Sequence, residues 1–127
     1  MNAPPTGASF CAAAMRDIAG DDDALVRELL DIFVRTVPPM AQRLAHALAR
    51  GRAAHVAREA HDLKSCLALV GAAEASARCT QIESAARRTG ACPPVDEAAR
   101  LCADIDHIVD LARRHLGCVT DPHETIR

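Results

Sequence analysis

Residues 52–71 read RAAHVAREAHDLKSCLALVG. Apolar residues in this stretch recur at alternating steps of four and three, the spacing that places side chains on one face of an α-helix. The stretch ends in glycine, a residue that commonly follows a helix end. It therefore predicts a helix from Arg52 to Val70 that buries a single stripe, formed by Val56, Ala60, Leu63, Leu67 and Val70.

The rest of the chain divides into segments of similar length, bounded by glycines or by paired prolines. Alanine is abundant and β-branched residues are few, which favours helices over strands. Three aspartates, Asp21 to Asp23, are suited to the start of a helix. We expect a short helix over Ser9–Ala19, a long one from these aspartates to Arg50, one over Ala73–Thr89 and a last one after Pro94.

Pro38 and Pro39 fall inside the long helix and are expected to kink or restart it, because proline lacks the helical N–H. The apolar positions expected along this helix are Leu25, Leu29, Ile32, Phe33, Val37, Met40, Leu44, Ala47 and Leu48. Those of the last two helices are Ala75, Cys79, Ile82 and Ala86, then Leu101, Ile105, Ile108, Ala112 and Leu116.

Short connections between such helices make neighbours antiparallel. The predicted fold is all-α, an up-and-down antiparallel four-helix bundle with a short extra N-terminal helix. We expect one domain over residues 9–117, with tails at 1–8 and 118–127.

The composition of the 127-residue chain excludes several classes of protein. Its net charge is −2, and it has two phenylalanines but no tryptophan or tyrosine, so we expect no nucleic-acid partner. No apolar run approaches the roughly 18 residues of a membrane span. The N-terminus has no secretory signal, so we expect a cytoplasmic protein without membrane contact.

No site for a metal or for another cofactor is expected. The six histidines lack the spacings that bundle-core metal sites use. The six cysteines form no tightly spaced pair, and we expect reduced thiols that pack in the core.

His61 stands at the edge of the predicted buried stripe, next to Ala60. Its helical neighbours include Ala57, Ser65 and Ala68, which are small, and Lys64, the only lysine of the chain. A nucleophilic imidazole beside a cation suits the acceptance of a phosphoryl group, because the cation offsets the incoming negative charge. On spacing alone, an ordinary exposed histidine beside a solvated lysine explains the same pair.

The run from Ala60 to Ala72, AHDLKSCLALVGA, resembles the signature of histidine-containing phosphotransfer (HPt) domains. Downstream, Cys79, Glu83 and Arg87 fall in a segment similar to the Cys-x-x-Leu-Glu-x-x-Ala-Arg pattern of that family. Upstream, residues 20–33 resemble its acidic-capped helix. The resemblance extends from about Phe10 to Leu116. One departure is Ser65, which occupies the position where the family usually has glycine.

The resemblance implies that His61 accepts the phosphoryl group and that Lys64 stabilises it. It implies a receiver contact face that includes Arg87, Glu83, Ser65, Ala57 and Ala68, although a surface ion pair accounts equally well for Glu83 and Arg87. The chain would then be a covalent phosphoryl carrier rather than an enzyme. The partners would be response-regulator receiver domains, which bring Mg²⁺, and a hybrid sensor histidine kinase.

Two other interpretations remain open. Ser65 in place of glycine favours a helical interaction module that binds a receiver or kinase without being phosphorylated, whereas the pairing of His61 with Lys64 opposes it. The chain could also be one domain of a hybrid kinase. Because it begins with Met and contains no kinase or receiver motif, we expect a free-standing monomer.

Overall fold

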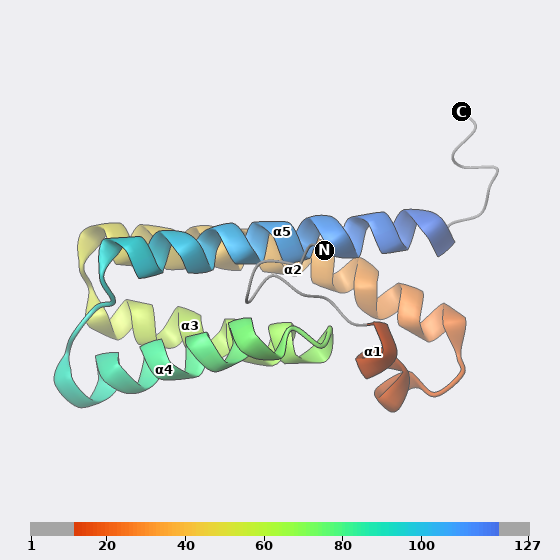
Figure 1. Ribbon diagram of the computed structural model, residues 1–127, viewed down its shortest axis with the longest axis horizontal. Helices are drawn as coiled ribbons and strands as arrows, with labels where there is room; N and C mark the ends of the chain where they lie inside the picture. Colours follow the sequence, from red (N-terminus) through yellow and green to blue (C-terminus); the bar gives the residue numbers. More distant parts are fainter. Residues whose placement is uncertain (1–11, 120–127) are drawn as a thin grey trace, which may run out of the picture.

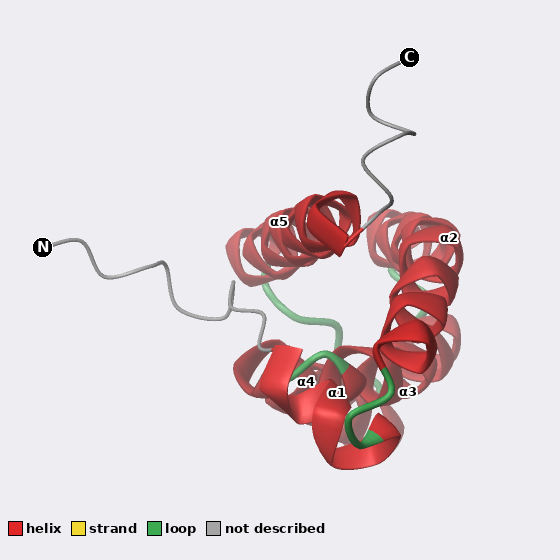
Figure 2. Cartoon of the chain, turned by 90° about the vertical axis from the view of Figure 1, so that its right-hand side faces the viewer, coloured by secondary structure: helices red, strands yellow, loops and turns green. Residues whose placement is uncertain are grey.

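Five α-helices make up the part of the chain that the computed structural model describes, residues 12–119, and no strand occurs there. They are α1 (Ala12–Ala19), α2 (Asp23–Arg50), α3 (Ala53–Leu69), α4 (Ala73–Thr89) and α5 (Val95–Val119). Helices α2 to α5 surround a common centre, as the view along the bundle shows (Figure 2). The structure thus confirms the predicted four-helix bundle with a short N-terminal helix.

Helices α2 and α5 are much longer than α3 and α4, with 28 and 25 residues against 17 each. At 1.5 Å per residue, the long pair extends beyond the short pair by about 12 to 16 Å. Helix α1 lies at this overhanging end (Figure 1). Its Met15 is fully buried, so α1 completes the core where α3 and α4 have ended.

Helix boundaries follow the local chemistry of the sequence. The Asp22 side chain accepts a hydrogen bond from the Leu25 N–H at 3.1 Å and caps the start of α2, as the acidic run predicts. Gly51 ends α2 with a φ of 65°, a left-handed conformation that glycine adopts without strain. The bounds of α4 are those predicted, and α3 is one residue shorter at each end than expected.

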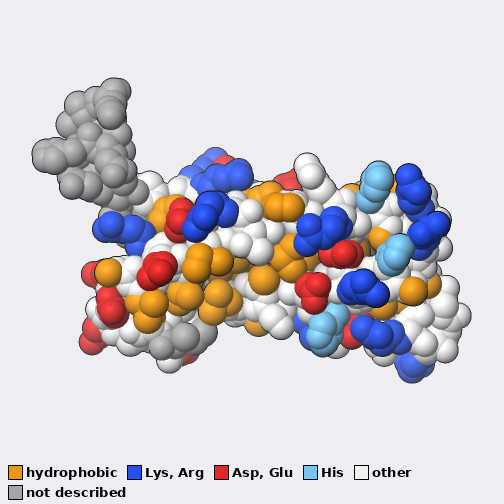
Figure 3. Space-filling view, turned by 180° about the vertical axis from the view of Figure 1, so that it is seen from behind, with side chains coloured by type: hydrophobic (Ala, Val, Ile, Leu, Met, Phe, Trp, Pro, Cys, Tyr) orange, Lys and Arg blue, Asp and Glu red, His pale blue; other side chains and the backbone are white. Residues whose placement is uncertain are grey.

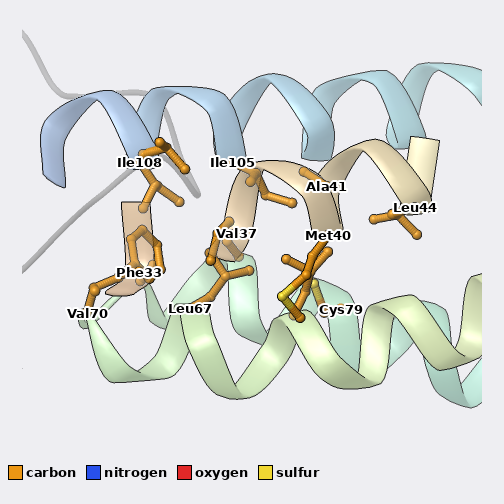
Figure 4. Close-up of a cluster of buried hydrophobic side chains, with 14 of the residues drawn as sticks. Phe33, Val37, Met40, Ala41, Leu44, Leu67, Val70, Cys79, Ile105 and Ile108 are labelled. Atoms are coloured by element: carbon orange, nitrogen blue, oxygen red, sulfur yellow. The ribbon is translucent and has the colours of Figure 1, made fainter. Parts of the chain in front are cut away.

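The core lies between the four helices of the bundle, α2 to α5. The predicted stripe on α3 is entirely buried, and so are the predicted positions on α4. Figure 4 shows side chains from α2, α3, α4 and α5 meeting in one cluster, among them Phe33, Val37, Met40, Leu67, Cys79, Ile105 and Ile108.

The long helix α2 differs from the expectation in two respects. It continues through Pro38 and Pro39, so it does not restart there, and the flanking Val37 and Met40 are both buried in the core. In the first turns of α2, Leu25 and Ile32 are exposed, whereas Val26 and Leu30, which were not expected in the core, are buried. The expected positions further along the helix are buried as predicted, namely Phe33, Val37, Met40, Leu44 and Ala47.

Most of the predicted tails and the start of the predicted first helix lie outside the residues that the structure describes. Residues 1–11 and 120–127 lie outside the described residues, including the expected tail 1–8 and the positions Ser9 to Cys11. Cys118 and Val119 continue α5 instead of beginning the expected tail. Within residues 12–119, no helix is both long and apolar enough to cross a membrane.

Candidate functional site

His61 lies near the middle of α3, with 53% of its side chain exposed. The preceding residue, Ala60, is fully buried. This confirms the prediction that the imidazole stands at the edge of the buried stripe and remains accessible. A ring in this place can meet a partner without any change in the helix.

Helices α3 and α4 pack closely against each other because their facing residues are small. Gly71 and Ala72 form a tight turn between them, and the buried residues on the two helices include Ala57, Ala75 and Ala86. This turn places Glu83, twelve residues after Gly71, opposite His61, ten residues before it. The close packing also corrects one prediction, because Ala57 is only 2% exposed and cannot belong to an accessible receiver contact face.

Glu83 binds three basic side chains at once. One carboxylate oxygen, Oε2, accepts from His61 Nδ1 at 3.0 Å and from Arg87 Nε at 2.9 Å. The other, Oε1, accepts from Lys64 Nζ at 3.0 Å. The carboxylate therefore connects the histidine and lysine of α3 to the arginine of α4.

The same contacts determine the ionisation of Glu83. The hydrogen bond from Lys64 contributes most, and those from Arg87 and His61 add to it. Together they lower the pKa of the Glu83 carboxyl from 4.5 to about 2, against the opposing effect of burial. With 13% of its side chain exposed, Glu83 is a fixed negative charge throughout the physiological range.

The hydrogen bond from His61 to Glu83 assigns the tautomer of the ring. An ionised carboxylate can only accept, so Nδ1 carries the proton and the neutral ring has its lone pair on Nε2. Among the described residues, none contacts Nε2 by a hydrogen bond. The nitrogen that can act as a nucleophile is thus the one left open.

The other predicted site residues are placed as follows. Lys64 is partly buried, and its carbonyl accepts a hydrogen bond from Ser76 Oγ at 2.8 Å. Ser65 and Ala68 are exposed on α3, and Arg87 is exposed on α4. The structure thus brings His61, Lys64, Glu83 and Arg87 together.

Sequence reasoning found the pair of Glu83 with Arg87, four residues apart, but missed the bonds from Glu83 to α3. The Gly71 turn was the one signal that could have indicated them, through the register that it imposes on the two helices. Ser76 was missed for the same reason.

Among the residues that the structure describes, the other reactive groups do not form a second centre. Within residues 12–119, no group of three or more histidine, cysteine or acidic side chains is placed to hold a metal ion. Cys66, Cys79, Cys92 and Cys102 are free thiols. Burial raises the pKa of Cys66 and Cys102, and it raises that of Cys79 to about 12, so these three thiols are poor nucleophiles.

Comparison with known proteins gives a family and a fold. The family model described as "Hpt domain" matches residues 28–115. Among solved structures, the chain is similar to the HPT domain from a sensor hybrid histidine kinase of Shewanella, with a TM-score of 0.74 and 18% sequence identity. That match covers 88% of this chain and 97% of the other. No curated protein matches the chain.

Proposed function

This chain belongs to the Hpt domain family and acts in histidine phosphotransfer in phosphorelays, and we propose that His61 is the residue that accepts the phosphoryl group. The observation that supports this assignment is the hydrogen bond from Nδ1 to Glu83. It leaves the Nε2 lone pair of an exposed ring free to attack.

The proposed reaction is a direct displacement. Nε2 attacks the phosphorus of an aspartyl phosphate on a receiver domain, and an N–P bond forms while the O–P bond breaks. The aspartate leaves as a carboxylate. The imidazole then holds a proton on Nδ1 and the phosphoryl group on Nε2, so the ring is positively charged.

Glu83 is a positioning residue in this scheme. Its carboxylate holds the proton on Nδ1 and stabilises the positive ring that the reaction creates. In the next transfer, an aspartate of a second receiver attacks the phosphorus and the N–P bond breaks. The ring returns to the neutral form with its proton still on Nδ1.

Lys64 and Arg87 balance the charge of the bound group. A phosphoryl group adds close to two negative charges. Lys64 is one turn from His61, within reach of the phosphoryl oxygens, and Arg87 contacts the same Glu83 oxygen as the ring. Because the carrier returns unchanged only after a second partner has reacted, we regard it as a covalent carrier and not as an enzyme.

Hpt domains work with receiver domains and hybrid kinases. We propose that this chain takes the phosphoryl group from one receiver and passes it to another, as a monomer in the cytoplasm, with Mg²⁺ bound by the receiver. The exposed Ser65 and Ala68 beside His61 give a receiver room to approach.

The test is transfer of labelled phosphate from phosphorylated receivers of the same genome. Wild-type protein is expected to become labelled, His61→Gln protein to remain unlabelled, and His107→Gln protein to label fully. His107 is a matched control because it is an exposed histidine on α5, away from Glu83. Undiminished labelling of the His61→Gln variant would refute the assignment. A wild-type protein that binds a receiver but takes no label would instead be an interaction module.

A further inference from the structure

One long stretch of this chain contains basic residues and no acidic residue. Residues 32–58 contain five arginines and no aspartate or glutamate, although the net charge of the whole chain is −2. These residues form most of α2 and the start of α3. Figure 3 shows basic and histidine side chains gathered at the end of the molecule where α2 turns into α3, whereas the other half of that face mixes apolar, acidic and basic side chains.

Four of these arginines line one shallow groove at the α2–α3 turn. They are Arg43, Arg50, Arg52 and Arg58, called here the arginine surface. Glu59, the only acidic residue in the groove, is bound to Arg43 at 3.3 Å. In the described part of the chain, no carboxylate pairs with the other three.

Several arginines elsewhere in the chain are paired. Arg16, Arg35 and Arg114 each bind a carboxylate at 2.7 to 3.0 Å. Arg78, Arg88, Arg100 and Arg113 form no ion pair among the described residues, but none of these four lines this groove. The arginine surface is therefore a site of uncompensated positive charge on a molecule that is slightly acidic overall.

The arginine surface begins next to the candidate phosphorylation site. Arg58 precedes His61 by three residues and Arg52 by nine, which is about 4.5 Å and about 14 Å along the helix axis. A protein interface of ordinary size covers about 800 Å² on each partner, a disc about 16 Å in radius. Around α3, Arg58 lies about 60° from His61, whereas Arg52 lies about 180° from it, on the side of α2. A receiver centred on His61 would therefore cover Arg58 and bring its rim beside the other arginines.

We propose that the arginine surface binds an acidic patch on the receiver that lies outside its phosphorylated aspartate. The inference rests on the proposed function of His61. It adds that the charge of the receiver surface determines which receivers are selected. Charges at the rim of an interface act mainly on the association rate, and they disfavour partners of like charge. Receivers with acidic surfaces beside their active site are the preferred partners.

A nucleic acid fits this surface less well. The groove contains no phenylalanine, tyrosine or tryptophan on which a base could stack, and its ring side chains are the two histidines His46 and His55. The remainder of the chain is net negative, which would repel a long polyanion. A folded partner with a local acidic patch avoids this repulsion.

The test compares Arg50→Glu/Arg52→Glu protein with wild type, using a panel of purified receivers with different surface charge. Both substitutions lie away from His61, and neither arginine side chain has an ion-pair or hydrogen-bond partner among the described residues. Arg113→Glu/Arg114→Glu is the matched control, because it makes the same charge change near the opposite end of the bundle. A thermal melt of each variant confirms that it is folded.

At about 20 mM salt, the kcat/KM for transfer from acidic receivers is expected to fall at least about tenfold in the double variant. The control should change by less than about twofold. Two charge reversals at about 10 Å from acidic groups give an effect of this size. The difference should shrink at about 0.5 M salt, and the transfer rate at saturating receiver should stay unchanged.

Equal kcat/KM values in wild type and double variant at low salt would overturn the proposal. So would DNA or anionic-vesicle binding that the double variant loses while its transfer is unchanged. If wild-type protein accepts no phosphate, the assignment of His61 fails instead. In that case, binding of the same receivers to wild type and to the double variant is measured by direct titration and tests the docking surface alone. Weaker binding of acidic receivers by the double variant would support the docking surface, and equal binding would refute it.

Discussion

Replacing Glu83 with glutamine should slow phosphotransfer by about 10- to 100-fold while the bundle stays folded. Glutamine has nearly the same shape, but it removes the charge and turns one carboxylate oxygen into an N–H₂ group. Depending on its orientation, the N–H₂ group would face either Lys64 or the pair His61 and Arg87. All three are hydrogen-bond donors, so this group could not accept from them. The imidazole of His61 then loses the charged acceptor that holds the proton on Nδ1. It also loses the negative charge that stabilises its positively charged form.

The magnitude follows from the contacts that are lost. A hydrogen bond to a charged group is worth about 1.5–3 kcal/mol, and each 1.4 kcal/mol is a factor of ten in rate. The two ion pairs with Lys64 and Arg87 are partly exposed and contribute under about 1 kcal/mol each. We therefore expect a loss of about 1–2 kcal/mol in the free energy of unfolding at pH 7.

This loss in stability should depend on pH. The pKa of Glu83 is about 2 in the folded protein against 4.5 ordinarily, so its stabilising effect is complete above about pH 4.5 and disappears as the pH falls towards 2. Melts of wild type and Glu83→Gln protein should differ by a constant amount from pH 7 to 4.5. They should converge between pH 4.5 and 2.

Three measurements check the prediction: rapid-quench transfer of labelled phosphate, melts over this pH range, and NMR of the His61 ring nitrogens to identify the tautomer. Asp106→Asn is the control, since it removes an exposed carboxylate on α5 and should change none of the three. A Glu83→Gln variant that transfers at the wild-type rate, with the proton still on Nδ1, would refute the role of Glu83 as a positioning residue.

Two further substitutions give separate tests. Lys64→Ala should slow transfer by up to about fivefold without abolishing it, because a partly exposed charge contributes under about 1 kcal/mol; a rate and a phosphoprotein lifetime equal to wild type would remove Lys64 from the site. Asp104→Asn should raise the free energy of unfolding at pH 7 by about 1 kcal/mol, because Asp104 Oδ2 is buried without a hydrogen-bond partner among the described residues. Burial raises the pKa of Asp104, so the penalty is present at neutral pH and vanishes below its ordinary value of 3.8. Denaturant titrations at pH 7 and 3 test this, and a variant no more stable than wild type at pH 7 would contradict it.

The apolar pattern predicted some helices better than others. On α3 the buried stripe has one possible register, and all five of its positions are buried. On α2, apolar residues stand side by side at Leu25 and Val26 and again at Ile32 and Phe33. Two stripes are then equally consistent with the sequence, and only packing against the other helices selects the one that contains Val26 and Phe33.

The sequence by itself determined that His61 and Lys64 share a helix face, since two residues that are three positions apart in a helix are separated by about one turn. It also predicted that His61 is exposed, because this residue follows the stripe member Ala60 and lies at the edge of the buried face. Only the tertiary structure assigned Glu83 to the ring of His61. The two residues are 22 positions apart, and their contact depends on the register of α3 against α4, which the Gly71 turn and the small residues between the helices set together. Local spacing cannot encode a register between two helices, because it results from the packing of their whole interface.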